Sequence, residues 1–270
     1  MLPGVYLATK KDGTAYYRSS IHYQGRHISL GSFDKEQRAN QAYLEAHHVL
    51  YNLKITIADI FQMTTILTFE KMVSLVNFRD HHIYFKNPIY LKNRFFIYYI
   101  SKQDELKFDV DDLFYYSSHK IMRRNGHLFV NDYGMQVNIL SRYGIKNYAV
   151  AKKDYLFANG DNTDFRYSNI IIINRYYGVT KFFKKSIPYY KAKIHIHGTV
   201  VIGVYTTEEK AAIAYNKAVD TAKCYGIKKD FQTNYIIHYS PKEYEDAYAN
   251  TSIPSTYISY LKKWANTTNS

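Results

Sequence analysis

Polar and apolar side chains alternate along two short runs near the start of the chain, which are joined by Gln24-Gly25. A β-strand points successive side chains to opposite faces, so each run separates into two sets. Ile21, Ile28 and Leu30 fall on the apolar side. The pattern predicts a β-hairpin whose other face is polar and carries Arg18, Ser20, His22, His27 and Ser29.

A helical pattern follows this hairpin. Asp34 is a residue type that caps helix N-termini, and small or aromatic residues then recur at helical spacing, at Ala39, Ala42, Tyr43 and Ala46. The pattern predicts a helix that covers the apolar face of the sheet and leaves the polar face uncovered. A solvated polar face is common in antiparallel sheets, so this stretch alone does not indicate a partner.

The same pattern occurs a second time, at residues 189–218. A Gly-Val pair and a lysine-bearing first strand precede each copy. The second copy places Lys191, Lys193 and His195 at the outward positions, again with no carboxylate. Two copies that keep a face rich in hydrogen-bond donors indicate an anionic partner. The matched positions include Tyr17 with Tyr190, Ile21 with Ile194, His22 with His195, Gly25 with Gly198, Gly31 with Gly203 and Ala42-Tyr43 with Ala214-Tyr215.

Four motifs of this repeat resemble the ethylene-response-factor (APETALA-type) DNA-binding domain. The resemblance covers residues 4 to about 50 and 176 to about 234, and it implies a three-stranded sheet that lies in the DNA major groove with a helix packed behind it. The chain lacks the exposed Trp and the many strand arginines of the plant members, so no base preference carries over. In the first copy the motifs are Gly4-Val5, Tyr17-Arg18, Leu30-Gly31-Ser32-Phe33 and Ala39-Asn40-Gln41-Ala42-Tyr43; in the second they are Gly178-Val179, Tyr190-Lys191, Ile202-Gly203-Val204-Tyr205 and Ala211-Ala212-Ile213-Ala214-Tyr215.

The charge of the chain agrees with an anionic partner. The 270 residues include 36 Lys and Arg against 23 Asp and Glu, a formal net charge of +13. The second repeat, residues 176–234, carries 10 basic and 4 acidic residues. This balance suits phosphate groups, although it also suits an anionic membrane surface.

Hydropathy and cysteine content limit the class of protein. No segment reaches the roughly 18 apolar residues of a membrane span, so we expect a soluble protein. The single cysteine, Cys224, excludes an intramolecular disulfide and is expected to be a packed helix residue. We expect the protein at the nucleoid in a bacterial or phage setting, or in the nucleus of a eukaryote.

The fold class predicted from these patterns is α+β, with two small sheet-plus-helix modules on either side of a mixed middle domain. The middle is expected to hold a helix over residues 68–80, strands over 89–100, a tight hairpin at Asn125-Gly126 and a short helix over 134–142. The tail shows helical patterns at 241–249 and 255–265. The expected domains are residues 1–54, 55–175, 176–234 and 235–270.

Part of the middle resembles the second half of an HNH homing endonuclease. The resemblance rests on Asn159-Gly160-Asp161 followed by Arg166-Tyr167-Ser168-Asn169-Ile170. It implies one His as general base and a second His or an Asp that holds a divalent metal. Asn138 and Phe157 stand at those positions, and neither side chain can do that chemistry. We therefore expect a degenerate scaffold with no catalytic residue.

Other histidines give no metal site by their spacing. The side chains of adjacent pairs such as His47-His48 and His81-His82 diverge, while His195 and His197 lack a third ligand. We expect no metal and no cofactor.

The sequence thus predicts a non-catalytic, bipartite protein that binds double-stranded DNA, with no membrane and no small-molecule substrate as partner. An active HNH endonuclease with ligands elsewhere, and a protein-interaction module with an aromatic surface, remain alternatives. The residues expected at or near the bases are Arg18, Ser20, His22, His27, Lys191, Lys193 and His195, and Tyr6 is expected in the same interface. Phosphate contacts are expected from residues near strand ends and turns, namely Lys10, Lys11, Arg26, Lys181, Lys184 and Lys185.

Overall fold

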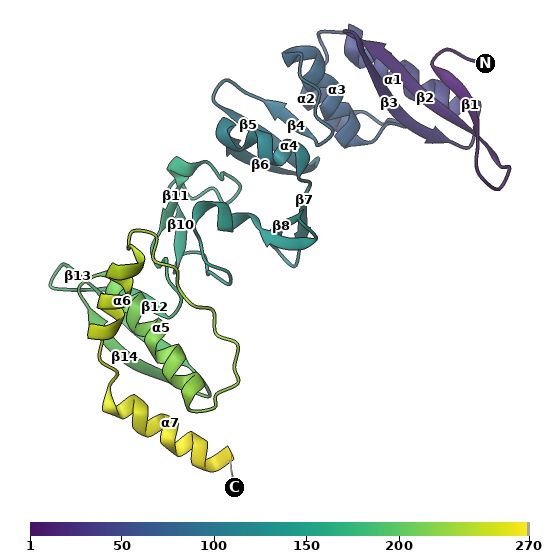
Figure 1. Ribbon diagram of the computed structural model, residues 1–270. Helices are drawn as coiled ribbons and strands as arrows, with labels where there is room; N and C mark the ends of the chain where they lie inside the picture. Colours follow the sequence, from purple (N-terminus) through teal and green to yellow (C-terminus); the bar gives the residue numbers. More distant parts are fainter. Residues whose placement is uncertain (269–270) are drawn as a thin grey trace. The chain divides into compact units, whose positions relative to one another are not determined.

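The computed structural model describes residues 1–268 and consists of small antiparallel sheets and helices (Figure 1), which confirms the α+β class. The chain divides into two compact units. The first unit contains residues 1–139 and 157–170, and the second contains residues 140–156 and 171–270. Each unit includes one copy of the repeat, so we call the copy in the first unit module 1 and the copy in the second unit module 2.

Module 1 is a three-stranded sheet covered by one helix (Figure 1). Ala39, Ala42 and Ala46 of the helix are fully buried, because their small side chains let the helix lie close to the sheet. Asp34, expected to be the helix cap, instead lies two residues before the helix, with its carboxylate 3.5 Å from Arg38. The elements are β1 (Val5–Thr9), β2 (Ala15–Tyr23), β3 (Arg26–Phe33) and α1 (Glu36–Tyr51), with sheet order β1-β2-β3.

A β-bulge interrupts the pairing of β2 with β3. Ser19 lies opposite Gly31 and the next residue, Ser20, lies opposite Ser29, so one residue of β3 has no partner across the ladder. The extra residue shifts the alternation of side chains. Ser29 and Ser32 therefore share one face, although residues three apart on a regular strand would point to opposite faces.

The core of module 1 continues into the next two helices. These are α2 (Ile57–Gln62) and α3 (Phe69–His81), which begin after the caps Thr56 and Thr68, so the helix predicted over residues 68–80 is confirmed. Met72, Leu75 and Val76 of α3 are buried against α1. The buried guanidinium of Arg79 donates to the backbone carbonyls of residues 49, 52 and 55, which fixes the end of α1 against α3.

Two further three-stranded sheets follow in the first unit. Phe96, Phe108 and Tyr116 stack in the core of the earlier one. The tight hairpin predicted at Asn125-Gly126 is present, since both residues adopt the positive φ that such turns need. The elements are β4 (Ile89–Leu91), β5 (Phe95–Ser101), β6 (Asp104–Asp109), the 3-10 turn η1 (Val110–Asp112), α4 (Leu113–Ser118), β7 (Ile121–Arg124), β8 (His127–Asp132) and β9 (Met135–Asn138).

The helix predicted over residues 134–142 is wrong. Tyr133 and Gly134 have φ of 46° and 78°, and they form a second tight turn that returns the chain as β9. A 3-10 helix, η2 (Ile139–Tyr143), follows. A two-stranded sheet then pairs β10 (Tyr155–Phe157) with β11 (Ile170–Ile172), and η3 (Tyr167–Asn169) leads into β11.

Module 2 repeats the architecture of module 1 in the second unit (Figure 1). Its bulge follows Ala192 and leaves Ile202 without a partner, at the position that Leu30 occupies in module 1. Cys224, expected to be packed, is exposed because it is the last residue of the helix. The elements are β12 (Val179–Lys184), β13 (Ile187–His195), β14 (Thr199–Tyr205) and α5 (Glu208–Cys224), in sheet order β12-β13-β14.

Both helices predicted in the tail are confirmed, as α6 (Pro241–Asn250) and α7 (Ser255–Thr268). They extend the core of module 2. The fully buried Tyr257 of α7 donates its hydroxyl to the carbonyl of Ala218 in α5, at 3.0 Å.

Candidate nucleic-acid interface

The face of module 1 that α1 leaves uncovered carries three cross-strand pairs: Arg18 with Ser32, Ser20 with Ser29, and His22 with His27. We call this surface, together with Tyr6 opposite Arg18, the open face of module 1. The imidazole rings of His22 and His27 lie 4.8 Å apart between centroids. The structure therefore brings together the five residues that the sequence assigned to this surface, Tyr6, Arg18, Ser20, His22 and His27.

Ser20 does not project from the open face as expected. Its side chain lies at the base of a hollow of about 310 Å³ that Tyr6, Arg18 and Ser29 also line. The larger side chains of Tyr6 and Arg18 stand beside it, and Ser20 is only 7 % exposed. Its hydroxyl makes no hydrogen bond to any described residue, so it is available to a group that enters the hollow.

The open face of module 2 is built from the equivalent pairs: Lys191 with Val204, Lys193 with Val201, and His195 with Thr199. Nδ1 of His195 lies 3.2 Å from Oγ1 of Thr199. The aromatic rings of Phe182 and Tyr189 stack on the same face, and the ammonium of Lys191 lies 5.1 Å from the centre of the Phe182 ring. Lysine and apolar groups thus replace the serines and arginine of module 1.

The lysines at the sheet ends occupy matching places in the two modules. Lys10 and Lys11 follow β1, while Lys184 ends β12 and Lys185 begins the turn after it. All four are exposed. They lie where a phosphate group beside the sheet could be reached.

Arg26 and Lys181 lie away from the open faces. The guanidinium of Arg26 is 4.9 Å from the centre of the Tyr84 ring, which packs on the core of module 1. Lys181 was expected near a strand end, but it lies within β12 opposite Tyr190, whose ring packs on the core of module 2. Alternation along the strand places Lys181 on the helix side, where its ammonium lies 6.0 Å from the Tyr190 ring centre.

Neither open face contains a carboxylate. The six strands of the modules include no Asp or Glu. Acidic residues of module 1 lie in a turn and at the helix start, where Asp12 accepts from the backbone of Thr14 and Glu36 accepts from the backbone of Leu2. The open faces therefore carry lysine and arginine side chains and no acidic ones.

The alternating pattern of the sequence did not predict that Val201 and Val204 both lie on the open face, because a regular strand without a bulge would place them on opposite faces. Gly31 and Gly203, at equivalent places in the two copies, were the available signal, since glycine inside a strand often marks a bulge.

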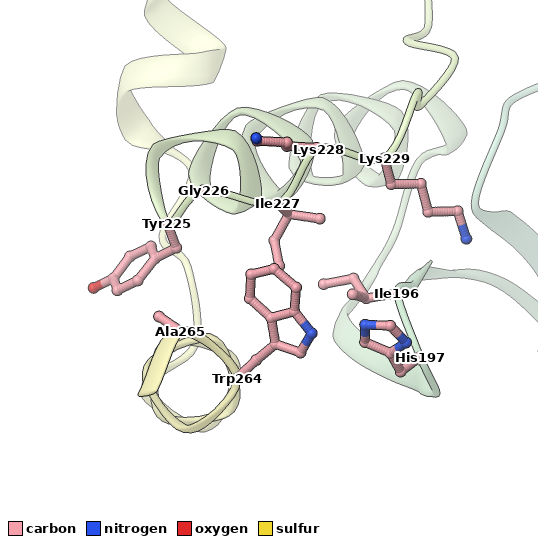
Figure 2. A pocket seen from close by; sticks show the side chains of 9 residues that line it. All are labelled: Ile196, His197, Tyr225, Gly226, Ile227, Lys228, Lys229, Trp264 and Ala265. Carbon is pink, nitrogen blue, oxygen red and sulfur yellow. The ribbon is translucent and has the colours of Figure 1, made fainter. Parts of the chain in front are cut away.

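A cavity of about 580 Å³ lies beside the tip of the β13–β14 hairpin (Figure 2). The rings of His197 and Trp264 stack within it at a centroid distance of 5.8 Å. The ammonium of Lys229 donates to the carbonyl of His195 at 2.8 Å, which ties this cavity to the end of the open face of module 2. Lys228 also lines the cavity, but its ammonium points away from His197 (Figure 2).

The turn at Asn159-Gly160-Asp161 is held by side chains of the turn and by Lys107 of β6. The carboxylate of Asp161 accepts from the hydroxyl and backbone N–H of Thr163, and its other oxygen lies 3.0 Å from the ammonium of Lys107. The hydrogen bonds from Thr163 and the nearby ammonium lower the pKa of Asp161 to about 2. Asp164 forms a two-point ion pair with Arg166, which lowers the pKa of Asp164.

The two positions where the resemblance implies catalytic groups lie in ordinary structural surroundings. Phe157 ends β10 and packs edge-on against Phe165, with 5.5 Å between ring centroids. Asn138 ends β9 and lies opposite Phe129 of β8. Among residues 1–268, no three His, Cys, Asp or Glu side chains are grouped so that they could hold a metal ion.

Comparisons with protein-family models, with curated proteins and with solved structures found no match to this chain. Within the described part of the chain, no helix is both long enough and apolar enough to cross a membrane.

Proposed function

We propose that this chain is a non-catalytic protein that binds double-stranded DNA sequence-specifically, with the open faces of its two modules as the recognition surfaces. The observation that carries the proposal is the pair of equivalent sheets, each covered by a helix on one face and free of carboxylates on the other. The modules need only the covered face in order to fold. The absence of carboxylates from both open faces therefore indicates that these faces bind a partner.

The dimensions of the sheets support this proposal. Neighbouring strands lie about 4.8 Å apart, so the backbone of a three-stranded sheet is roughly 10 Å wide. The major groove of B-DNA is about 12 Å wide and presents hydrogen-bond acceptors such as N7 and O6 of guanine. Side chains at the centre of each open face, such as Arg18 and Lys193, would reach base edges, while Lys10, Lys11, Lys184 and Lys185 would reach phosphates.

The HNH-like segment fits a supporting role in this proposal. Its acidic side chains are already neutralised by Lys107 and Arg166, and Phe157 and Asn138 can neither hold a metal nor accept a proton. We propose that it spaces the modules. A protein of this kind would act like a transcription factor or derive from a mobile element.

The proposal is tested by selecting bound fragments from random duplex DNA with the full chain, and then measuring affinity for the selected site. The charge reversal Lys191→Glu with Lys193→Glu places two carboxylates on the open face of module 2, and it should weaken binding at least a hundredfold. Lys210→Glu with Lys223→Glu is the matched control, because it makes the same change in charge at two exposed lysines of α5, behind the sheet. Equal affinities of the charge-reversed and control proteins would contradict the proposal, as would the absence of any selected duplex.

A further inference from the structure

The cross-strand pairs of the two open faces can be compared position by position. In module 1, Ser32 and Ser29 lie opposite Arg18 and Ser20. At the equivalent places in module 2, Val204 and Val201 lie opposite Lys191 and Lys193. The same bulge, sheet order and helix surround both sets. Since serine supports this architecture in one module, the fold does not require an apolar side chain at these places in the other.

The two valines are presented to solvent. Val201 and Val204 are 48 % and 50 % exposed, whereas Ile202 between them is 4 % exposed and belongs to the core. The bulge at Ile202 places both valines on the open face, directly opposite Lys193 and Lys191. Each valine therefore stands beside a lysine, as an apolar and cationic pair.

The chemistry of the major groove offers one partner for such a pair. Thymine alone among the four bases presents a methyl group there, and guanine presents the O6 and N7 acceptors that a lysine can contact. A serine hydroxyl, by contrast, can donate to or accept from several bases and gains little from a methyl group.

We infer that Val201 and Val204 of module 2 contact thymine methyl groups, beside guanines contacted by Lys191 and Lys193, and that module 1 reads a half-site without this dependence. The inference rests on the proposed function. It adds that the complete target is asymmetric, with a methyl-dependent half on the side of module 2 only.

The test replaces each thymine of the selected duplex, one at a time, with deoxyuridine, which removes only the 5-methyl group. The full chain should lose about fourfold in affinity at each thymine that a valine contacts, the equivalent of burying one methyl group. The variant Val201→Ala with Val204→Ala should bind the thymine and deoxyuridine duplexes equally at those positions. Val110→Ala, a substitution of an equally apolar, 43 % exposed residue in the first unit, should keep the wild-type sensitivity.

The outcomes separate this inference from the proposed function. Tight binding with no deoxyuridine-sensitive position, or with sensitivity that the double valine variant retains, would overturn the methyl contact and leave DNA binding in place. Absence of duplex binding by the unaltered chain would overturn both.

Discussion

The ring of Tyr215 lies directly against the Cα atom of Gly178, so that a Cβ atom added to this glycine would overlap the ring. Gly178 has φ of 69°, and its carbonyl accepts a hydrogen bond of 2.7 Å from the backbone of Lys193 at the bulge. Gly4 and Tyr43 form the same contact in module 1, where the carbonyl of Gly4 accepts from Ser20. This contact connects the helix tyrosine, the Gly-Val opening and the centre of the open face.

Gly178→Ala should therefore destabilise the second unit. The new methyl group would overlap Tyr215, and alanine at this φ is strained, so we expect a loss of about 2–4 kcal/mol in the free energy of unfolding. Hydrogen exchange of β12 and β13 measures the effect locally. Gly198→Ala is the control, because nothing lies within 4 Å of the position of its Cβ atom; an equal loss in both variants would contradict the role given to the Tyr215 contact.

Binding to duplex DNA should depend strongly on salt. If each module neutralises three or four phosphates, the logarithm of the association constant should fall with the logarithm of salt concentration at a slope of roughly −5 to −7. Titrations followed by fluorescence anisotropy at salt concentrations from about 50 to 200 mM measure this slope. An association constant that does not change with salt would contradict phosphate neutralisation. It would favour the alternative in which the chain binds a protein through an aromatic surface.

Lysines at the centre and at the end of the sheet should have different effects. Lys193→Ala should cost about 1–3 kcal/mol on the selected site and little on random DNA, because its partner would be a base edge. Lys184→Ala should weaken both alike, since it would remove a phosphate contact. Lys181→Ala should change neither much, because this side chain lies on the helix side of the sheet. Competition assays with selected and random duplexes distinguish the three results.

The two modules should contribute together. Arg18→Glu with His22→Glu places two carboxylates on the open face of module 1 only, and it should reduce affinity for the complete site to that of module 2 alone. Tethering raises the local concentration of the second module, so the loss should be at least a hundredfold. Unchanged affinity of this variant, measured on the complete site, would contradict bipartite binding.

The alternating pattern and the repeat were sufficient to predict the sheets, the covering helices and most of the residues on the open faces. They succeeded because burial on one face imposes a period of two on a strand, as at Ala192 and Ile194 of β13. Both tail helices were predictable from their helical patterns, and the first of them, α6, also begins with a capping box of Ser240 and Glu243.

Features that depart from regular strand or helix geometry could not be predicted from the sequence. The bulges at Leu30 and Ile202 reverse the alternation, so the strand pattern alone could not place Val204 on the open face. A non-glycine residue at positive φ, Tyr133, produced a hairpin where periodicity favoured a helix. Lys181 was expected near a strand end, although alternation with the buried Val179 on β12 would have placed it on the helix side.

The turn of the HNH-like segment should lose stability in acid. The pKa of Asp161 lies at about 2 in the folded protein, below its ordinary value of 3.8, so its contribution is present above pH 3.8 and is lost as pH falls toward 2. Asp161→Asn should destabilise the protein at pH 7 by about 1 kcal/mol, a modest figure because solvent screens the partly exposed pair with Lys107. The difference between variant and wild type should be much smaller at pH 2, where about half of the Asp161 carboxyl groups are protonated in the folded protein. Urea unfolding followed at both pH values measures this, and a difference at pH 2 as large as that at pH 7 would contradict the assigned cause.

The purified protein should neither cut nor nick its selected binding site in magnesium, manganese or zinc. The resemblance to HNH nucleases implies a general base at Asn138 and a metal ligand at Phe157, and loss of both groups should leave no cleavage above background. Phe157→His alone should not restore activity, because the base is still missing, whereas Asn138→His combined with Phe157→His supplies both groups and is the variant in which a trace of nicking is expected. Supercoiled plasmid carrying the selected site detects single nicks. Metal-dependent cleavage by the unaltered protein that disappears on His119→Ala or His127→Ala would show that the active site lies at the hairpin instead, and that this chain is an endonuclease.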